Sequence, residues 1–584
     1  MTSIGSPSPF FLAGKKAYAV DRSLRFNNDD SANLNRQYAQ EPTSQYKMTF
    51  SCWVKRCSSD SGIQTVIGVQ DNWETPISFS NDSLRVVGPN QSATYITTAK
   101  YRDFSAWMHV MTVYDTQNST GADRMICYIN GERLTDFSTS GTVTLNQTVV
   151  RALRSGYNTY IGRDGVGNYG DMYIAEVNVI DGQALTPSDF TETDSTTGQL
   201  NPKKYVGSYG TNGFYLNFSD SSSLGADSSG NSNNFTPNNF STTAGVGNDS
   251  LEDSPTNNFC TLNPLSNGTG AAPSNGNLDF ATTSSATGTM VTTIPVSSGK
   301  WYCEATITTG SNNGAVGIRS IDQSSVTTNT LGNQTLDYAY RGNGQKFNNN
   351  SKTSYGSSYT TNDVIGIALD LDGGTIKFFK NNSDQGTAFS SISGTYVFAI
   401  GDDNSSSAFN GSFNFGQRAF TYTPPLNFVA LSSANLPDPT ILLPNKHFDN
   451  LLWTGDGNDN RNITGLNFQP DWVWIKERSS TSGHVLTDSV RGIPAVLESN
   501  STGAEDTSSG AADIVQSFNS DGFQVGTSGR VNQSGQTNVG WNWNAGDTDG
   551  KTYTVTVVSD SGNKYRFDGF GTSAVTLDLA EGGT

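Results

Sequence analysis

The sequence predicts an all-β protein made of several antiparallel β-sandwich (jelly-roll) domains in series. Of its 584 residues, 61 are glycine, only 34% are hydrophobic and only 15% are charged. Such a mixture favours short strands joined by polar turns and leaves little room for helices. Aromatic residues still reach 11%, whereas disordered chains are poor in them. At about 100 to 200 residues per domain, the length predicts several cores rather than one.

Charge and cysteine content narrow the classes of partner and cofactor. The net charge of -18 opposes attraction to phosphate backbones and anionic membranes, so neither nucleic acid nor a membrane is expected as a partner. No stretch approaches the ~20 apolar residues of a membrane-spanning helix, and the N-terminus lacks the basic start of a signal peptide. The five scattered cysteines are expected to be reduced and buried. Cys52 and Cys57, the close pair, make a poor zinc site.

Residues 23–195 carry the first organised block. The run 48–55 alternates like a strand buried on one face, and Asn130-Gly131 is a strong hairpin signal. In order, the phrases FSCWVK, WMHV, YINGE, YIGR and IAEVNVIDGQALT resemble a LamG-type, concanavalin-like jelly roll. This resemblance implies two packed sheets that bind carbohydrate or protein, sometimes with calcium.

The wider concanavalin-like superfamily includes glucanases with a Glu-x-Asp-x-x-Glu strand. Here only Glu176 stands near the corresponding strand, and Asn178 follows where a second carboxylate is needed. Hydrolysis by paired carboxylates is therefore not expected, and the protein is predicted not to be an enzyme. Loop aromatics and amides are instead the expected sugar contacts. The predicted carbohydrate-binding residues are Tyr157, Asn158, Asp164, Asn168 and Tyr169.

Residues 196–269 turn to Ser, Asn, Gly and Asp, with one strand-like island at 214–218. Such stretches bury too little to stay ordered, so a solvated linker with one strand is expected. The phrases KKYVGSYGTNGFYL and SPTNNFC resemble a segment of virion proteins from tailed phages of marine bacteria, where it joins a jelly roll to the next domain.

Residues 270–432 contain GKWYCE, VGI, DVIGIALDLD, IKFFKNN and NFGQ, an order that resembles a SPRY domain. The resemblance implies a β-sandwich that binds proteins or glycans through its loops. Glu304, Asp370 and Asp372 are expected to face solvent. A calcium ion could bridge the two aspartates, but calcium takes six or more oxygens, so no metal site is assigned and no cofactor is expected.

Residues 433–546 form a third, β-rich block, in which PDWVWIKER and DSVRG resemble marine phage appendage proteins. Trp472 and Trp474 share one strand face, and core packing is favoured there over a sugar-stacking platform. His484 with Asp488 suggests acid–base chemistry, but no Gly-x-Ser-x-Gly elbow accompanies them. Residues 547–584 predict three strands, too few to stand alone. Either a partner chain completes that sheet or the natural chain continues past residue 584.

Together these features favour a virion protein, a tail fibre or appendage that binds host surface carbohydrate or a receptor during phage adsorption. It would be made in the host cytoplasm and released by lysis, with other tail or capsid proteins as partners. A homotrimer follows from the resemblance alone. Residues 1–22 form the expected docking arm, and the alternative is a strand tucked into the jelly roll. The predicted docking residues are Pro9, Phe10, Phe11 and Leu12.

Two other classes compete with this interpretation. A capsid decoration or tail scaffold subunit would stabilise the particle without meeting the host. A polysaccharide depolymerase is permitted by analogy of fold, although no catalytic pair is visible.

Overall fold

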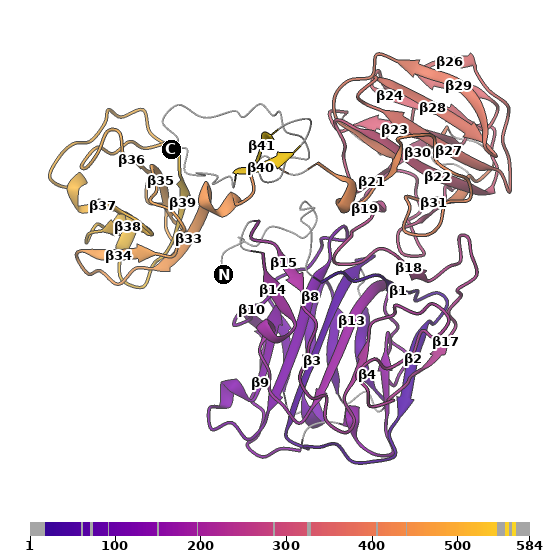
Figure 1. Ribbon diagram of the computed structural model, residues 1–584. Helices are drawn as coiled ribbons and strands as arrows, with labels where there is room; N and C mark the ends of the chain where they lie inside the picture. Colours follow the sequence, from indigo (N-terminus) through magenta and orange to yellow (C-terminus); the bar gives the residue numbers. More distant parts are fainter. Residues whose placement is uncertain are drawn as a thin grey trace. The chain divides into compact units, whose positions relative to one another are not determined.

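The computed structural model confirms an all-β protein (Figure 1). It describes residues 18–59, 62–70, 74–91, 93–148, 151–194, 197–283, 287–323, 329–403, 407–437, 439, 441–545, 555–559 and 563–567. The chain forms two compact units, residues 7–440 and residues 441–584, which are described separately. No helix among the described residues is long and apolar enough to cross a bilayer. The predicted docking residues Pro9, Phe10, Phe11 and Leu12 lie outside the described residues.

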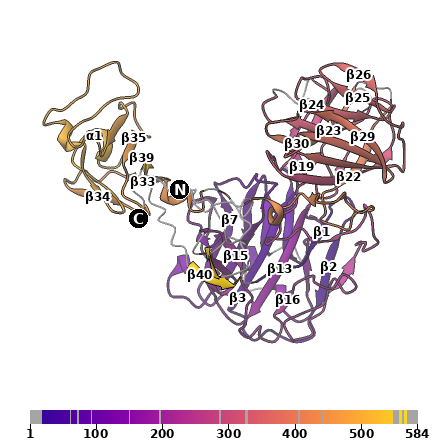
Figure 2. The same ribbon diagram turned by 45° about the horizontal axis from the view of Figure 1, so that its top comes forward.

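The first sandwich packs two eight-stranded sheets against each other (Figure 2). One sheet runs β10 (Glu132–Arg133), β9 (Met125–Ile129), β8 (Met108–Asp115), β3 (Lys47–Arg56), β13 (Met172–Asp181), β1 (Ser23–Phe26) and β18 (Ser250–Leu251), with β16 (Phe214–Leu216) also paired to β13. The other runs β11 (Phe137–Thr139), β7 (Thr94–Thr97), β6 (Ser83–Val87), β5 (Thr75–Ser80), β4 (Ile63–Val69), β12 (Asn158–Ile161), β2 (Asn33–Gln37) and β17 (Thr236–Asn238). A separate pair joins β14 (Thr191–Thr193) to β15 (Leu200–Pro202).

Strand β3 differs from the expectation of one buried face, because both of its faces are buried. Phe50, Cys52 and Val54 point into the core between the sheets. Trp53, on the opposite face, packs in a second cluster with Trp107. The chain lays a covering layer over the outside of this sheet, and alternation alone does not reveal such a layer.

Residues 196–269 are not a solvated tether in the structure. Strands β16, β17 and β18 pair with β13, β2 and β1, so the segment extends both sheets of the first sandwich. Asp227 explains how so polar a segment is ordered, since its carboxylate accepts the main-chain N–H groups of Tyr215, Ser229 and Asn233. Asp, Asn and Ser side chains here replace the partners that a regular ladder would supply.

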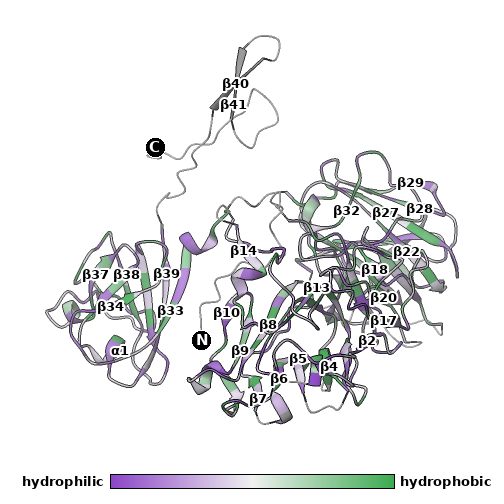
Figure 3. Cartoon of the chain, turned by 60° about the horizontal axis from the view of Figure 1, so that its bottom comes forward, coloured by the Kyte–Doolittle hydropathy of each residue, from purple (hydrophilic) through white to green (hydrophobic). Residues whose placement is uncertain are grey.

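The second sandwich also has two sheets, and its apolar residues follow the strands (Figure 3). One runs β19 (Leu262–Asn267), β21 (Thr287–Thr292), β30 (Tyr396–Asp403), β23 (Ala315–Ser320), β24 (Asp337–Arg341), β25 (Gln345–Asn348) and β26 (Ser351–Ser354). The other runs β20 (Asp279–Phe280), β31 (Asn410–Asn414), β22 (Lys300–Thr309), β27 (Val364–Asp370), β28 (Thr375–Lys380) and β29 (Ser383–Ser390), with β32 (Val429–Ala430) parallel to β22.

Within the unit of residues 7–440, buried polar contacts tie the first sandwich to the segment that leads into the second. The Lys55 ammonium bonds Asp253 at 2.8 Å, and both side chains are at most 1% exposed. The Trp107 indole donates to the same carboxylate at 2.9 Å. Arg25 pairs with Asp249 at 2.9 Å, and both of these side chains are also buried. The covering layer of the first sheet is thus fixed by specific charge pairs as well as by apolar packing.

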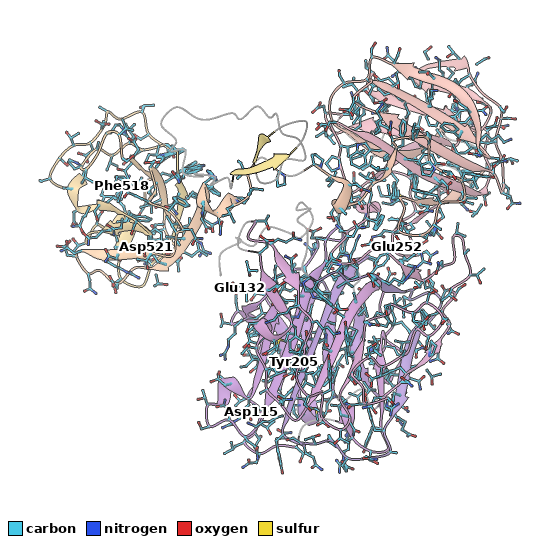
Figure 4. The ribbon with its side chains drawn as sticks, viewed as in Figure 1. Asp115, Glu132, Tyr205, Glu252, Phe518 and Asp521 are labelled. Carbon is cyan, nitrogen blue, oxygen red and sulfur yellow. The ribbon has the colours of Figure 1, made fainter. Side chains whose placement is uncertain are left out.

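The third module, in the unit of residues 441–584, has a four-stranded and a three-stranded sheet around one small core. The larger sheet runs β33 (Phe448–Thr454), β39 (Thr537–Trp543), β35 (Trp472–Glu477) and β36 (Val485–Asp488). The smaller runs β34 (Arg461–Thr464), β38 (Gly522–Val525) and β37 (Val515–Asn519). Phe518, labelled in Figure 4, packs against that core. Strands β40 (Val555–Ser559) and β41 (Asn563–Phe567) pair with each other, and the expected third strand at 575–579 lies outside the described residues.

Helices are short. The helix α1 covers Gly529–Asn532, and the 3₁₀ turns are η1 (Pro89–Gln91), η2 (Gly121–Asp123), η3 (Arg151–Leu153), η4 (Pro187–Asp189), η5 (Ser433–Asn435), η6 (Pro444–Lys446) and η7 (Ala511–Asp513). The hairpin predicted at Asn130-Gly131 is present, with φ of 50° and 82° in the left-handed region that such two-residue turns need. All five cysteines are free and buried, as predicted.

Candidate carbohydrate-binding surfaces

The predicted sugar-binding loop of the first sandwich is built around Asp164, which is fully buried. Its carboxylate accepts the main-chain N–H groups of Val166 and Asn168 at 3.1 and 3.0 Å, and the Asn168 amide at 2.6 Å. Because these contacts occupy both of its oxygens, Asp164 shapes the loop. Direct sugar contact would then fall to the partly exposed side chains beside it.

An arginine joins the loop to strand β12. The Arg163 guanidinium lies 4.7 Å from the centre of the Tyr160 ring and 5.2 Å from that of Tyr169, and it donates to the Tyr169 hydroxyl at 3.1 Å. Tyr160 was not among the predicted residues. It shares a strand face with Asn158, two residues away, and this spacing could have identified it.

The other two predicted residues have different partners. Tyr157 faces the Arg151 guanidinium at 5.5 Å, while the Asn158 amide donates to Gln70 at 2.9 Å. The structure thus brings Asp164, Asn168 and Tyr169 into one loop and gives Tyr157 and Asn158 separate contacts. The role of all five in sugar binding stays a prediction.

Glu176 occupies an unusual site on the outer face of the same sandwich. It lies in a β-bulge of β13 with φ of 52°, a left-handed conformation that is strained for a residue with a side chain. Its carboxylate accepts the hydroxyls of Tyr18 and Tyr215 at 2.8 to 2.9 Å. Burial raises the pKa of Glu176 to about 7, against the lowering effect of those hydrogen bonds.

Asn178, two residues beyond Glu176, accepts the Tyr209 hydroxyl at 2.7 Å. The aromatic layer over this face continues to Tyr205, labelled in Figure 4, which stacks on Phe190. The arrangement therefore provides one carboxyl group, several phenols and an amide, beneath a covering layer.

In the second sandwich, Glu304 was expected to face solvent, but its side chain is buried. It accepts the main-chain N–H groups of Thr421 and Tyr422, both at 2.8 Å, and so fixes the chain after the last long strand. Asp370 pairs with Lys300 at 2.8 Å, and Asp372 accepts the Gly299 N–H at 2.8 Å. A calcium ion between these aspartates would compete with those contacts. Among the described residues no three His, Cys, Asp or Glu side chains cluster as metal ligands.

The third module carries an aromatic face on its four-stranded sheet. Cross-strand partners place Phe448, Trp543 and Trp472 in one row, and Trp541 beside Trp474 in the next. The five side chains are partly exposed. We call the set Phe448, Trp472, Trp474, Trp541 and Trp543 the aromatic face.

The rings of the aromatic face touch one another. Trp472 and Trp543 stack with centroids 4.3 Å apart, and Trp474 lies 6.4 Å from Trp472 in a nearly parallel plane. Trp541 and Phe448 extend the set, with centroids 5.4 Å from Trp474 and 4.9 Å from Trp543. Mutual contact limits the freedom of each ring, so the surface is largely organised before any ligand arrives.

The prediction that Trp472 and Trp474 pack in the core is wrong. Val473 and Ile475, the alternate residues of β35, are fully buried in the core and leave the indoles on the other side. On β39 the inward position opposite Ile475 is Gly540, where an added Cβ would lie 3.2 Å from the core ring of Trp453. The small residue on β39 and the β-branched residues on β35 together decide which face turns inward.

Charged groups lie at one margin of the aromatic face. Asp488, the cross-strand partner of Trp472, pairs with Arg491 at 2.6 Å, and Arg491 also contacts Glu505 at 2.8 Å. Burial opposes the effect, but the Arg491 hydrogen bonds lower the pKa of Asp488 overall. His484 bonds Trp474 and not Asp488, so the pairing considered from sequence is not formed.

Three domain families match parts of this chain. Residues 26–190 match the concanavalin A-like lectin/glucanases superfamily, residues 300–417 match the SPRY domain, and residues 443–581 match a domain of unknown function, DUF7483. The chain therefore contains a concanavalin-like domain and a SPRY domain, as the sequence motifs predicted. The third match includes both the third module and most of the expected C-terminal domain.

Similarity to whole proteins is limited. The chain is 36% identical over 104 residues to the ATP-dependent RNA helicase DDX1 of Xenopus laevis, covering 18% of this chain and 14% of the helicase. It is 32% identical over 141 residues to Ddx1 of Drosophila melanogaster, covering 23% and 18%. The chain thus spans less than a fifth of either relative.

Among solved structures, the SPRY domain of human HERC1 is 19% identical, with a TM-score of 0.21, and the match covers 24% of this chain and 91% of that one. The TRIM65 PSpry domain is 12% identical, with a TM-score of 0.23, over 26% and 91% of the two chains.

Proposed function

We propose that this protein binds carbohydrate at a cell surface, with the aromatic face of the third module as its main contact. The observation that carries the proposal is a set of four indoles and a phenyl ring that touch one another and are partly exposed on one sheet. Partly exposed aromatic rings offer apolar surface to the C–H faces of sugars, while nearby polar groups can meet the hydroxyls. The concanavalin-like and SPRY domains are binding folds, which supports the same class of function.

The particular role we propose is that of a tail fibre or appendage that contacts host glycan or receptor during phage adsorption. The support is the resemblance of four sequence segments to marine phage virion proteins, together with the polar, acidic composition. In this role the protein is made in the host cytoplasm, joins other virion proteins as a homo-oligomer and leaves by lysis. Binding is proposed to need no cofactor and to leave the glycan uncut, with neither nucleic acid nor membrane as a partner.

A binding experiment on the full chain tests the aromatic face. Cellohexaose, chitohexaose and purified bacterial surface polysaccharides are presented to the wild-type protein and to the double variant Trp472→Ala/Trp543→Ala. We expect the variant to lose at least about tenfold in affinity, because interface aromatics typically cost more than about 1 kcal/mol when truncated. Equal binding by both proteins would reject the aromatic face as the site.

The variant Tyr157→Ala/Tyr169→Ala is the matched control, since it removes two aromatic rings from the predicted loop of the first sandwich. We expect it to lose less affinity than Trp472→Ala/Trp543→Ala, because the aromatic face is the proposed main contact. Loss of binding in this variant alone would move the site to the first sandwich. Gold-labelled antibody on intact phage particles then tests the virion role, together with host adsorption in the presence of excess free protein. Label on the capsid, with adsorption unaffected by the free protein, would favour the decoration subunit.

A further inference from the structure

His484 lies beside the aromatic face and contacts one of its central rings. The Trp474 indole N–H donates to Nδ1 of His484 at 2.8 Å, and the two ring centroids are 5.6 Å apart. An imidazole nitrogen that accepts a hydrogen bond carries no proton. This contact therefore requires the neutral form of His484 with its proton on Nε2.

Trp474 connects His484 to the other rings of the aromatic face. It touches both Trp472, 6.4 Å away, and Trp541, 5.4 Å away. A change in the orientation of Trp474 would therefore disturb its neighbours on two strands. When His484 takes a second proton, Nδ1 becomes a donor, and two donors then face each other at 2.8 Å.

The charged groups packed around His484 are held by other partners. Arg530 donates to the main-chain oxygen of His484 and pairs with Glu498 at 2.8 Å. The Lys476 ammonium bonds main-chain oxygens, including that of Glu477. The Glu477 carboxylate accepts a serine hydroxyl at 2.6 Å. On the strand that follows His484, Asp488 is paired with Arg491, as described above.

We propose that His484 is a positioning residue for the aromatic face. Neutral imidazole holds the Trp474 ring in its place, and protonation of His484 releases that ring, so that sugar affinity falls at acidic pH. The part concerning affinity rests on the proposed function, whereas the movement of Trp474 does not.

The test follows the full-length protein between pH 8 and pH 5 by near-ultraviolet circular dichroism and by affinity for cellohexaose and chitohexaose. In the wild type we expect the tryptophan signal to change and affinity to fall roughly fivefold, the factor that corresponds to one hydrogen bond of about 1 kcal/mol. In His484→Gln, whose amide oxygen accepts the indole N–H at every pH, we expect both quantities to stay constant.

Trp474→Phe is the second variant, because it keeps an aromatic ring and removes the donor. It should also lose the pH dependence of both quantities. If His484→Gln keeps the wild-type pH profile, His484 is not the positioning residue. If no sugar binds at either pH, the proposed function fails, and the circular dichroism of the same proteins still decides the role of His484.

Discussion

The outer faces of two β-sheets in this molecule differ in their burial. In the first sandwich, the face of β3 and β13 that points away from the core is covered, and its Trp53, Trp107 and Tyr173 are at most 1% exposed. In the third module, the outer face of β33, β39 and β35 keeps its tryptophans partly exposed. The same residue types thus serve packing in one sheet and present a surface in the other. Within the part of the chain that the structure describes, the difference is that a covering layer lies over the first face and not over the second.

The covering layer of the first sandwich depends on buried charge. Replacing Asp253 with alanine leaves the Lys55 ammonium buried without its carboxylate, and the Trp107 indole N–H also loses its acceptor. We expect the unit of residues 7–440 to lose about 3 to 5 kcal/mol of stability, the cost of breaking a buried pair. Calorimetry of the full chain should show one transition moving to lower temperature while that of the third module stays.

The matched control for this prediction removes both charges, as Lys55→Met/Asp253→Leu. Apolar residues of similar size often replace a buried ion pair at little cost, so most of the lost stability should return. A double variant as unstable as Asp253→Ala would show that the shape of the pair, rather than its charge, holds the layer in place.

Glu176 makes the stability of the covered face depend on pH. Burial raises its pKa to about 7 in the folded protein, from an ordinary value of 4.5. The stability that this group provides is full below about pH 4.5 and is lost as the pH rises through about 7, because the folded state holds the proton more tightly. The shift corresponds to about 3 kcal/mol. Glu176→Gln removes the titration and should be the more stable protein at pH 8.

Amide hydrogen exchange in β13 and β16, compared at pH 5.5 and pH 8, measures this effect once the intrinsic rates are corrected. In the wild type, protection should fall at the higher pH, and in Glu176→Gln it should change little. Tyr18→Phe, which loses a single hydroxyl, should keep the pH dependence. Equal profiles in wild type and Glu176→Gln would show that the carboxyl group is not the source.

The two faces also mark what the sequence could and could not predict. Alternation and turns such as Asn130-Gly131 predicted strands, and long motifs identified two of the domains. The sequence did not predict that residues 196–269 are ordered. Composition does not reveal that the Asp227 carboxylate accepts several main-chain N–H groups. The aromatic face was missed for another reason. Each alternating set of β35 has two apolar residues followed by one charged residue, so periodicity alone cannot say whether Trp472 or Val473 points inward.

The smallest expected effect separates packing from recognition within one strand. Val473→Ala removes two methyl groups from the core, and we expect it to lower the stability of the third module by about 2 kcal/mol. Its affinity for cellohexaose or chitohexaose at 25 °C should stay unchanged. The neighbouring Trp472→Ala should have the reverse balance, with affinity reduced more than stability, because its ring lies on the partly exposed side.

Thermal unfolding and sugar affinity, measured on the same two single variants, decide this comparison. If Trp472→Ala destabilised the module as strongly as Val473→Ala and left affinity unchanged, the aromatic face would be a packing surface like that of the first sandwich. Its natural cover would then be another protein segment. The opposite balance would mean that a β-sheet can leave its larger aromatic residues outside, because β-branched residues fill the core and Gly540 leaves room there for the Trp453 ring.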